Sequence, residues 1–213
     1  MAIEKADERR LQMINAQLRT SDVNEFEILS AFTDVPREKY VAPGLEALAY
    51  ADGEVAAAGP KGRKLLSPRT LGLLLKCVAP VAGERALVVG GGSGYCAALL
   101  AALGLDVVAL ETDASAATAG NARITHAEGA LSEPPAGQGR FDVIVVNGAF
   151  EITPDRLIGA LSEKGRLVGL SAATRAKRIV LFERSGGGIS ETALYDAAGD
   201  VLPGFGRAQA FAF

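Results

Sequence analysis

The sequence predicts an α/β fold: a doubly wound, mostly parallel sheet with an antiparallel C-terminal edge, preceded by N-terminal helices. From residue 85 onward, short apolar runs of strand length alternate with segments that favour helices, such as 94–103 and 153–162. Continuous apolar runs are typical of strands that helices cover on both faces, as in a parallel sheet. The expected parallel strands are residues 85–89, 106–110, 122–126, 141–146 and 165–170.

The C-terminal part of the chain has a different pattern. Residues 177–196 form two apolar runs joined through the glycines of "SGGG", which predicts an antiparallel hairpin. The last six residues, "AQAFAF", alternate as a final strand would. We therefore expect the parallel sheet to end in antiparallel strands.

Two amphipathic helices are expected at the start of the chain. The second should begin at Ser21 or Asp22, because both residue types are good N-caps, and should end before Pro36, which removes an amide donor. Their apolar stripes are Leu11, Ile14 and Leu18 in the first helix and Phe26, Leu29 and Phe32 in the second.

The segment between these helices and the sheet has little periodicity. Residues 43–64 are rich in Ala and Gly, and we interpret them as a loop with short turns that serves as a lid or entrance segment. A helix over 67–78 follows, with Ser67 at its N-cap and Pro68 in its first helical position. Residues 132–140 are expected to form a loop that leads into the fourth parallel strand.

The composition is that of a globular protein with a buried core. The chain has 213 residues, of which 49% are hydrophobic and 22% charged. A net charge of −3 without a local Lys/Arg run argues against a nucleic-acid surface. The first residues are too charged for a secretory signal, and no apolar stretch reaches membrane-spanning length. We expect a soluble, cytoplasmic protein.

No metal site is expected. Cys77 and Cys96 lie in separate apolar segments and form no ligand-spaced pair, so they are interpreted as buried reduced thiols. The single histidine, His126, is expected to be a partly buried polar residue on or after the third parallel strand. One histidine without a cysteine cluster makes a zinc site improbable.

The strongest functional signal is a glycine cluster with an acid downstream. Gly90, Gly92 and Gly94 form G-x-G-x-G directly after the first predicted parallel strand, where glycines permit a tight turn and close approach of a ligand to the backbone. Glu111 closes the next strand, and a carboxylate there can accept hydrogen bonds from both hydroxyls of a ribose. The pattern predicts a site for a nucleotide-like ligand at the carboxyl ends of the strands.

Three ligands compete for this pattern. A dinucleotide requires a third glycine where Tyr95 stands, and usually a separate substrate domain. A nucleoside triphosphate requires G-x-x-x-x-G-K-[ST], which the sequence lacks. S-adenosylmethionine has a ribose for Glu111 and no phosphate, so that G-x-G-x-G suffices. A plain tight turn with an incidental acid is the alternative without a ligand.

Several segments, taken together and in order, resemble the protein-L-isoaspartate O-methyltransferase family. The resemblance covers the chain from about Arg9 to Leu170. The N-terminal segments "QLR" and "VPREKYV" are what indicate this branch of the methyltransferases. The resembling segments are "MINAQLR", "VPREKYV", "AYAD", "GGGSGYCAALLA", "VVALE", "HAEGAL", "FDVIVV" and "KGRLVGL".

The resemblance implies a seven-stranded sheet with an antiparallel last strand and S-adenosyl-L-methionine as methyl donor, with S-adenosyl-L-homocysteine as product. It implies an isoaspartyl-containing protein or peptide as acceptor, and no nucleic-acid or membrane partner is expected. Residues 1–80 would be a helical segment and entrance loop packed on a Rossmann-like methyltransferase core, 81–213. The donor-binding candidates are Gly90, Gly92, Ser93 and Gly94 for the methionine part, Glu111 for the ribose, Glu128 and Gly129 for the adenine, and Asn147 at the carboxyl end of the fourth strand.

The catalytic position is where the resemblance fails. The family has a Ser-x-Pro element whose hydroxyl is regarded as catalytic, and Ser67 is the tempting candidate for this role. With Pro68 aligned on the family's proline, however, Leu66 takes the place of the catalytic serine. Leucine cannot hydrogen-bond a carboxylate, and Ser67 has a structural role as an N-cap.

Further departures concern the donor site. Val88 stands where the family commonly has an acid, Glu128 replaces an aspartate, and the segment between Glu111 and Glu128 is shorter than in the family. Three hypotheses follow. The first is a working S-adenosylmethionine-dependent carboxyl methyltransferase of the isoaspartyl-repair type, or one with a shifted acceptor. The second is a non-catalytic descendant that keeps the fold as a binding or regulatory module, and the third is a nicotinamide-dependent oxidoreductase.

Overall fold

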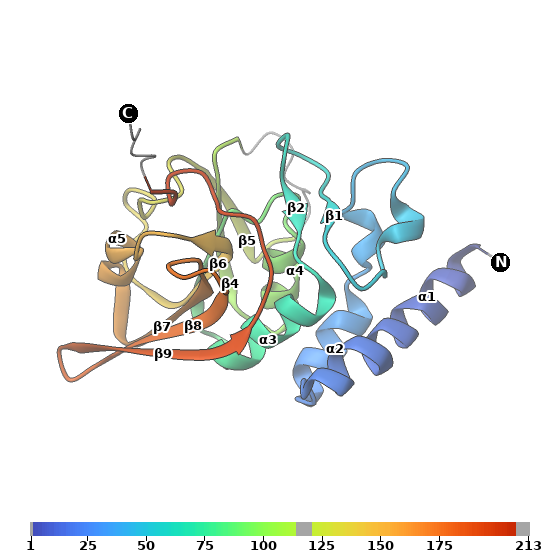
Figure 1. The fold of residues 1–213 in the computed structure, drawn as a ribbon, viewed down its shortest axis with the longest axis horizontal. Coiled ribbons are helices and arrows are strands. Elements are labelled where there is room, and N and C mark those ends of the chain that lie inside the picture. Colours follow the sequence, from blue (N-terminus) through green and yellow to red (C-terminus); the bar gives the residue numbers. More distant parts are fainter. Residues whose placement is uncertain (1, 114–120, 208–213) are drawn as a thin grey trace.

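The computed structural model describes residues 2–113 and 121–207 and contains one large sheet. Its strand order is β5-β4-β3-β6-β7-β8-β9, and the first five of these strands run parallel (Figure 1). β8 and β9 form an antiparallel hairpin on the outer side of β7. The strands are β3 Arg85–Val89, β4 Asp106–Glu111, β5 Ile124–Glu128, β6 Phe141–Phe150, β7 Leu161–Ser171, β8 Arg178–Ser185 and β9 Gly188–Asp196.

The predicted sheet is confirmed, including its seven strands and its antiparallel C-terminal edge. β6 and β7 are longer than their apolar runs, and β5 begins two residues later than expected, at Ile124. The predicted final strand at 208–213 lies outside the described residues.

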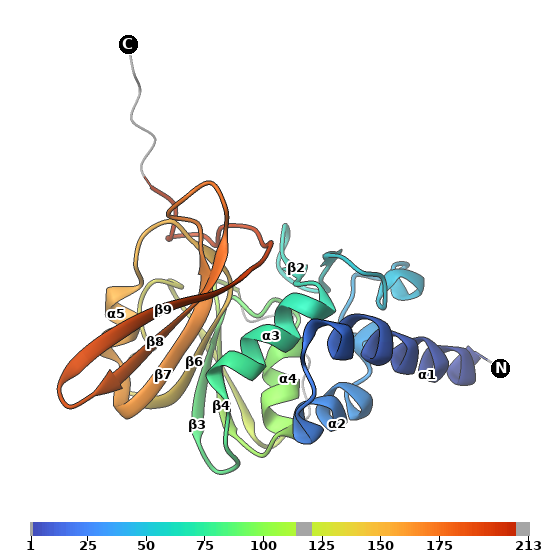
Figure 2. The ribbon, with the colours of Figure 1, turned by 60° about the horizontal axis from the view of Figure 1, so that its bottom comes forward.

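Alternating side chains of each strand enter separate cores on the two faces of the sheet. Val88 of β3 belongs to the core under α3 and α4, whereas its neighbour Leu87 belongs to the opposite core. Figure 2 shows α3 and α4 on one face and the short helix α5 on the other. The sheet is therefore covered on both faces, as the continuous apolar runs predicted. The helices are α3 Pro68–Val78, α4 Tyr95–Ala102 and α5 Asp155–Gly159.

α3 forms where the sequence predicts it. Ser67 caps the helix by accepting a hydrogen bond from the Thr70 amide at 3.2 Å, and Pro68 occupies the first helical position. Its apolar side chains pack against β6 and β7, which fixes the segment just before the helix at the carboxyl edge of the sheet.

The N-terminal helices differ from the prediction at three residues. Asp22 has a left-handed φ of 64° and ends the first helical run, because aspartate tolerates this conformation as well as it caps a helix. Leu11 is 51% exposed although Met13 and Ile14, two and three residues later, are buried, and Phe26, in the first turn of α2, is 79% exposed. The elements are α1 Ala2–Met13, η1 Ile14–Leu18, η2 Arg19–Ser21 and α2 Phe26–Asp34.

The predicted entrance segment, residues 43–64, is a loop with short turns. It contains η4 (Glu46–Leu48), follows η3 (Arg37–Lys39), and ends in the hairpin of β1 (Val55–Ala56) and β2 (Lys64–Leu65). This hairpin lies above the carboxyl edge of the main sheet (Figure 1). Within the described residues, no helix is both long and apolar enough to cross a membrane.

Candidate functional site

The glycine turn, residues 90–94, connects β3 to α4 at the carboxyl edge of the sheet. Gly90, Gly92 and Gly94 have φ angles of 71°, 60° and 93°, a region in which side chains are strained. The glycines at these positions are therefore required by the backbone itself. The turn has the conformation that lets a ligand approach the backbone closely.

Glu111 lies beside this turn, at the end of β4. Its carboxylate is buried and accepts hydrogen bonds from the Gly92 amide at 3.1 Å and the Thr112 amide at 2.9 Å. Arg63 of the entrance segment also binds it, with Nη2 at 2.5 Å from Oε1 and Nε at 3.1 Å from both oxygens. Glu111, the residue predicted to bind the ribose, is thus held in an ion pair with another residue of the chain.

The stem of Arg63 covers the glycine turn. A Cβ placed on Gly92 would lie 3.4 Å from the Cβ of Arg63 and 3.3 Å from that of Ala57. A hydrogen bond of 3.0 Å from the Ala57 amide to the Arg63 carbonyl closes the loop between β1 and β2. The entrance segment therefore lies directly on the turn.

A second cover comes from the C-terminal segment. Ala149 of β6 donates to the Asp200 carbonyl at 2.8 Å and accepts from the Leu202 amide at 2.9 Å. This pairing places the Leu202 side chain over two glycines: a Cβ on Gly90 or on Gly148 would approach it to 2.7 Å. An aliphatic side chain fills the space above the start of the glycine turn.

Asn147 is a buried polar side chain beside the glycine turn, and part of its hydrogen-bonding capacity is unused in the described structure. It lies in the irregular stretch of β6 between Val145 and Ala149 and is only 5% exposed. Its Nδ2 donates to the Gly90 carbonyl at 3.3 Å, while Oδ1 is buried without a partner in the described structure. A buried amide oxygen without a partner is costly and is typical of a ligand contact.

The space left at the site is small. One cavity of about 40 Å³ is lined by Arg63, Asn147 and Leu202, and another of about 10 Å³ lies against Glu111. Binding sites for cofactor-sized molecules measure roughly 300–1,000 Å³. The polar groups suit S-adenosylmethionine, but in this conformation the chain's own side chains occupy the room it would need.

The remaining residues that were predicted to bind the methyl donor lie around Glu111 or behind the glycine turn. Glu128 is exposed at the end of β5, in register with Glu111, and the Gly129 amide donates to the Glu111 carbonyl at 3.0 Å. Ser93 is fully buried, and its hydroxyl donates to the Tyr40 carbonyl at 2.6 Å, so any contact with a ligand would be through its backbone. His126 is exposed rather than partly buried, because β5 is the outer strand of the sheet.

The two candidates for the catalytic position differ in their environment. The Ser67 hydroxyl donates to the Thr70 side chain at 3.0 Å while it caps α3. Leu66 is buried and lines the 40 Å³ cavity next to Gly90 and Asn147. The residue that faces the site is thus apolar, and the adjacent hydroxyl is used by the helix.

Arg37 holds this stretch of chain in place and was not singled out by the sequence patterns. It is fully buried, donates to the Ala49 carbonyl at 2.7 Å and the Leu66 carbonyl at 2.8 Å, and lies over the Tyr95 ring at 5.1 Å. Burial lowers the pKa of its guanidinium. Its position in "VPREKYV", a segment quoted for the family resemblance, was the available signal.

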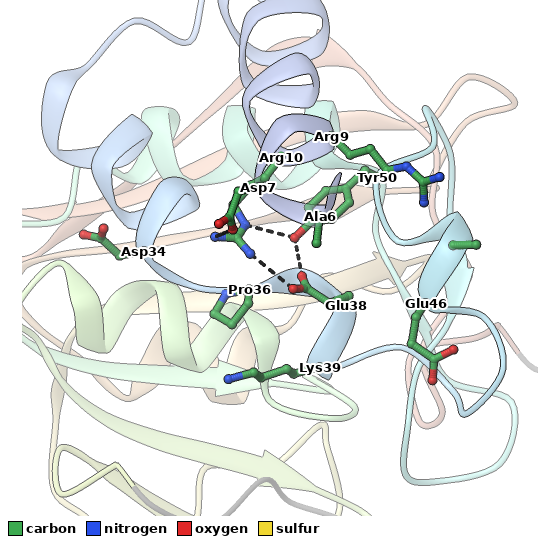
Figure 3. A pocket seen from close by; sticks show the side chains of 11 residues that line it. Ala6, Asp7, Arg9, Arg10, Asp34, Pro36, Glu38, Lys39, Glu46 and Tyr50 are labelled. Carbon is green, nitrogen blue, oxygen red and sulfur yellow. Dashed lines mark hydrogen bonds and ion pairs between the residues drawn. The ribbon is translucent and has the colours of Figure 1, made fainter. Parts of the chain in front are cut away.

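A much larger cavity, of about 780 Å³, lies away from the glycine turn, between α1 and residues 34–50 (Figure 3). Three of its polar groups are bonded to one another: Arg10 donates to the Tyr50 hydroxyl at 2.9 Å and to Glu38 at 3.2 Å, and Tyr50 donates to Glu38. Burial raises the pKa of Tyr50 to about 12. The cavity shares no lining residue with the glycine turn or Glu111.

The cysteines are free thiols, as predicted. Cys96 is fully buried, which raises the pKa of its thiol to about 12, and the half-buried Cys77 thiol has a pKa raised to about 11 by the same cause. Both are therefore protonated near neutral pH. In the described part of the chain, no group of three His, Cys, Asp or Glu side chains is placed to hold a metal ion.

The parallel sheet of this order, with a glycine turn after β3 and an acid at the end of β4, agrees with a class I methyltransferase fold. The sequence model of the protein-L-isoaspartate(D-aspartate) O-methyltransferase family matches residues 8–197. The chain belongs to this family. The resemblance predicted from the sequence is thereby confirmed, and with it the enzyme class of a methyltransferase.

Individual relatives agree with the family match. The chain is 34% identical over 169 residues to a protein-L-isoaspartate O-methyltransferase of Methylorubrum extorquens, covering 76% of this chain and 73% of the relative. It is 30% identical over 195 residues to one of Koribacter versatilis, covering 88% and 87%.

Two solved structures share the fold. One, a protein-L-isoaspartate O-methyltransferase, matches with a TM-score of 0.77 and 20% identity over 92% of this chain, which spans 66% of that protein's length. A Plasmodium falciparum protein of the same description, solved in complex with S-adenosyl-L-homocysteine, matches with a TM-score of 0.74 and 20% identity. The match covers 91% of this chain and 97% of that one.

Proposed function

We propose that this chain is an S-adenosylmethionine-dependent carboxyl methyltransferase that acts on isoaspartyl residues of proteins or peptides. The observation that carries the proposal is the buried Glu111 carboxylate beside the glycine turn, in a chain of this family. The proposal includes a cytoplasmic location, which the two free cysteines support.

The bound donor would supply an electrophilic methyl group on a sulfonium. Glu111 would accept hydrogen bonds from its ribose hydroxyls, and Gly90, Gly92 and Gly94 would let its methionine part approach the backbone. The unpartnered Asn147 Oδ1 is an acceptor suited to an ammonium group. Exposed groups at the end of β5, Glu128 and Gly129, would border the adenine.

The acceptor needs little activation by the protein. An ionised carboxylate is already a nucleophile, so the main tasks of the protein are to orient it and to exclude water. Leu66 can exclude water at the site but cannot donate a hydrogen bond to the carboxylate. We therefore expect slow transfer, since loss of one hydrogen-bond donor typically costs about 10²–10³ in rate.

The direct test is transfer of a labelled methyl group to an isoaspartyl peptide, with the matched aspartyl peptide as control. We expect base-labile label on the isoaspartyl peptide alone. Equal labelling of both peptides would contradict the proposed acceptor, and no labelling of either at high enzyme concentration would contradict the activity.

Leu66→Ser tests the catalytic position. If a hydroxyl at this place assists transfer, the variant should raise the rate on the isoaspartyl peptide about tenfold or more. Ser67→Ala is the matched control: it should lower stability by about 1 kcal/mol through loss of the cap and leave the rate per folded molecule unchanged. An unchanged rate for Leu66→Ser would count against the proposed alignment.

A second candidate function is a binding or regulatory module that takes the donor or its product without transferring methyl groups. The apolar Leu66 beside the site favours it. Calorimetric binding of S-adenosylhomocysteine, combined with no transfer by either the natural chain or the Leu66→Ser variant, would favour this candidate over the enzyme.

A further inference from the structure

We infer that Arg63 is an internal competitor of the methyl donor: it occupies Glu111 and the glycine turn in the ligand-free protein and must leave before the donor binds. This inference rests on the proposed function. It makes the entrance segment a gate, with one side chain that sets how tightly the donor is held.

Arg63 and the donor would require the same carboxylate. Nε and Nη2 of Arg63 form three contacts of 3.1 Å or less with the two oxygens of Glu111. The amides of Gly92 and Thr112 bind the same oxygens. A carboxylate offers about four lone-pair sites, so two ribose hydroxyls fit only if the guanidinium leaves.

Arg63 and the donor would also require the same volume. The Arg63 stem lies against Gly92, and the cavity left beside Glu111 measures about 10 Å³. The side chains of Arg63 and Glu111 are only 10% and 7% exposed, so the pair itself fills the space. Rotation of the Arg63 side chain alone would not open it, because the Cβ atoms of Ala57 and Arg63 also lie against the turn.

The hairpin that carries Arg63 is not part of the main sheet. β1 and β2 have two residues each and pair through two registered positions, Val55 with Leu65 and Ala56 with Lys64. The hairpin is also bonded to residues 40–42, through the Ala42 and Ala58 amides, so opening must move residues 40–65 together or break these bonds. A short element outside the main sheet opens at a lower cost in free energy than a core strand does. On opening, Glu111 keeps its two amide donors, so the carboxylate is not left without hydrogen bonds.

The Arg63 side chain donates three hydrogen bonds to Glu111 and so neutralises the carboxylate that would bind the ribose of the donor. When a protein binds its ligand only in a minor open state, the apparent affinity falls by the fraction that is open.

The test is calorimetric titration of S-adenosylhomocysteine into the natural protein and into Arg63→Ala. We expect Arg63→Ala to bind about tenfold tighter or more, because the competing ion pair is absent. Lys61→Ala, an exposed lysine of the same loop, is the matched control and should bind like the natural protein.

A second variant and a second measurement guard against loss of folding. Arg63→Gln keeps a hydrogen-bond donor near Glu111 without the charge and should show an intermediate gain in affinity. In thermal unfolding, we expect Arg63→Ala to have a lower midpoint than the natural protein without ligand and a larger upward shift with S-adenosylhomocysteine.

The outcomes separate the inference from the function on which it rests. Equal or weaker binding by both Arg63 variants, with binding by the natural protein intact, would overturn the inference and leave the proposed function standing. Absence of binding to the natural protein and to both variants at millimolar ligand would overturn the donor site and the inference together.

Discussion

Two arginine–glutamate pairs lie at opposite ends of the sheet and differ in what surrounds them. At the carboxyl edge, Arg63 binds Glu111 at 2.5 Å; at the amino edge, Arg166 binds Glu84 at 2.8 Å. Arg166 also donates to the Val78 carbonyl at 2.8 Å and so ties the last turn of α3 to the sheet. The carboxyl-edge pair joins the entrance segment to the end of β4 and, through the Gly92 amide, to the glycine turn.

The two pairs have the same residue types, so the difference in their roles comes from the residues around them. The amino edge is closed by interlocking contacts: Asp142 accepts from the Arg85 amide and from the Ser162 hydroxyl at 2.6 Å, which joins three strands. Contacts of this kind hold the amino edge in a single conformation. The carboxyl edge is covered by Leu202 and by a hairpin whose two strands have two residues each, and neither belongs to the main sheet.

The largest expected effect is on ligand affinity at the carboxyl edge. Glu111→Gln, made in the Arg63→Ala background so that the competitor is absent from both proteins, should weaken S-adenosylhomocysteine binding about ten- to hundredfold, since a hydrogen bond to a charged group contributes about 1.5–3 kcal/mol. Calorimetry measures the ratio. Glu84→Gln in the same background should leave affinity unchanged, and a comparable loss there would erase the contrast between the two edges.

A large effect on stability is expected at the amino edge. Arg166→Ala should lower the free energy of unfolding by about 2 kcal/mol, because it removes charged hydrogen bonds to Glu84 and to the end of α3. Urea unfolding measures this loss. Arg123→Ala, which breaks the exposed pair with Asp106, is the control and should cost less than about 1 kcal/mol. A similar cost for both variants would show that the amino-edge pair has no special role.

The smallest expected effect is on the free energy of unfolding, and it depends on pH. The Ser162 hydroxyl, followed by the Arg85 amide, holds the pKa of Asp142 below its usual range, against the opposing effect of burial. A lowered folded-state pKa stabilises the protein above the unfolded pKa of about 3.9, and this contribution is lost as the pH falls through the folded value. Ser162→Ala should therefore cost about 1 kcal/mol at pH 7 and less in acid.

Urea unfolding of the Ser162→Ala variant at pH 7 and near pH 3 checks this dependence. Ser190→Ala on the exposed strand β9 is the control and should be neutral at both values. Equal deficits at the two pH values would mean that Ser162 acts on stability without acting on the charge of Asp142.

The parts of the fold that could be predicted are those whose cause lies within a few residues. The Ser67–Pro68 start of α3, the glycine turn and the apolar run of β3 all form where the sequence indicates. Asp22 was misassigned because the same short polar side chain suits both the start and the end of a helix. Leu11 fits an ideal helical stripe with Ile14 and Leu18, but residues 14–18 form a π-helix, and that spacing no longer keeps the three side chains on one face.

Of the candidate site, only the glycine turn and the acid Glu111 could be predicted from the sequence. Gly90, Gly92 and Glu111 belong to one continuous βαβ pattern, so their proximity follows from local order. Arg63 lies 48 residues before Glu111 in an aperiodic segment, and Leu202 follows the last strand. No periodicity or spacing links such residues to the turn, because their contacts with it form only when the loops pack on the folded sheet.

The two residues that cover the glycine turn, Arg63 and Leu202, are synthesised at different times. Protein synthesis produces Arg63 before the turn and Leu202 more than a hundred residues after it, near the end of the described chain. Leu202 reaches Gly90 only through the pairing of its own segment with Ala149 of β6. During synthesis, the turn therefore stays uncovered on this side until Leu202 and the residues around it have emerged and paired with β6.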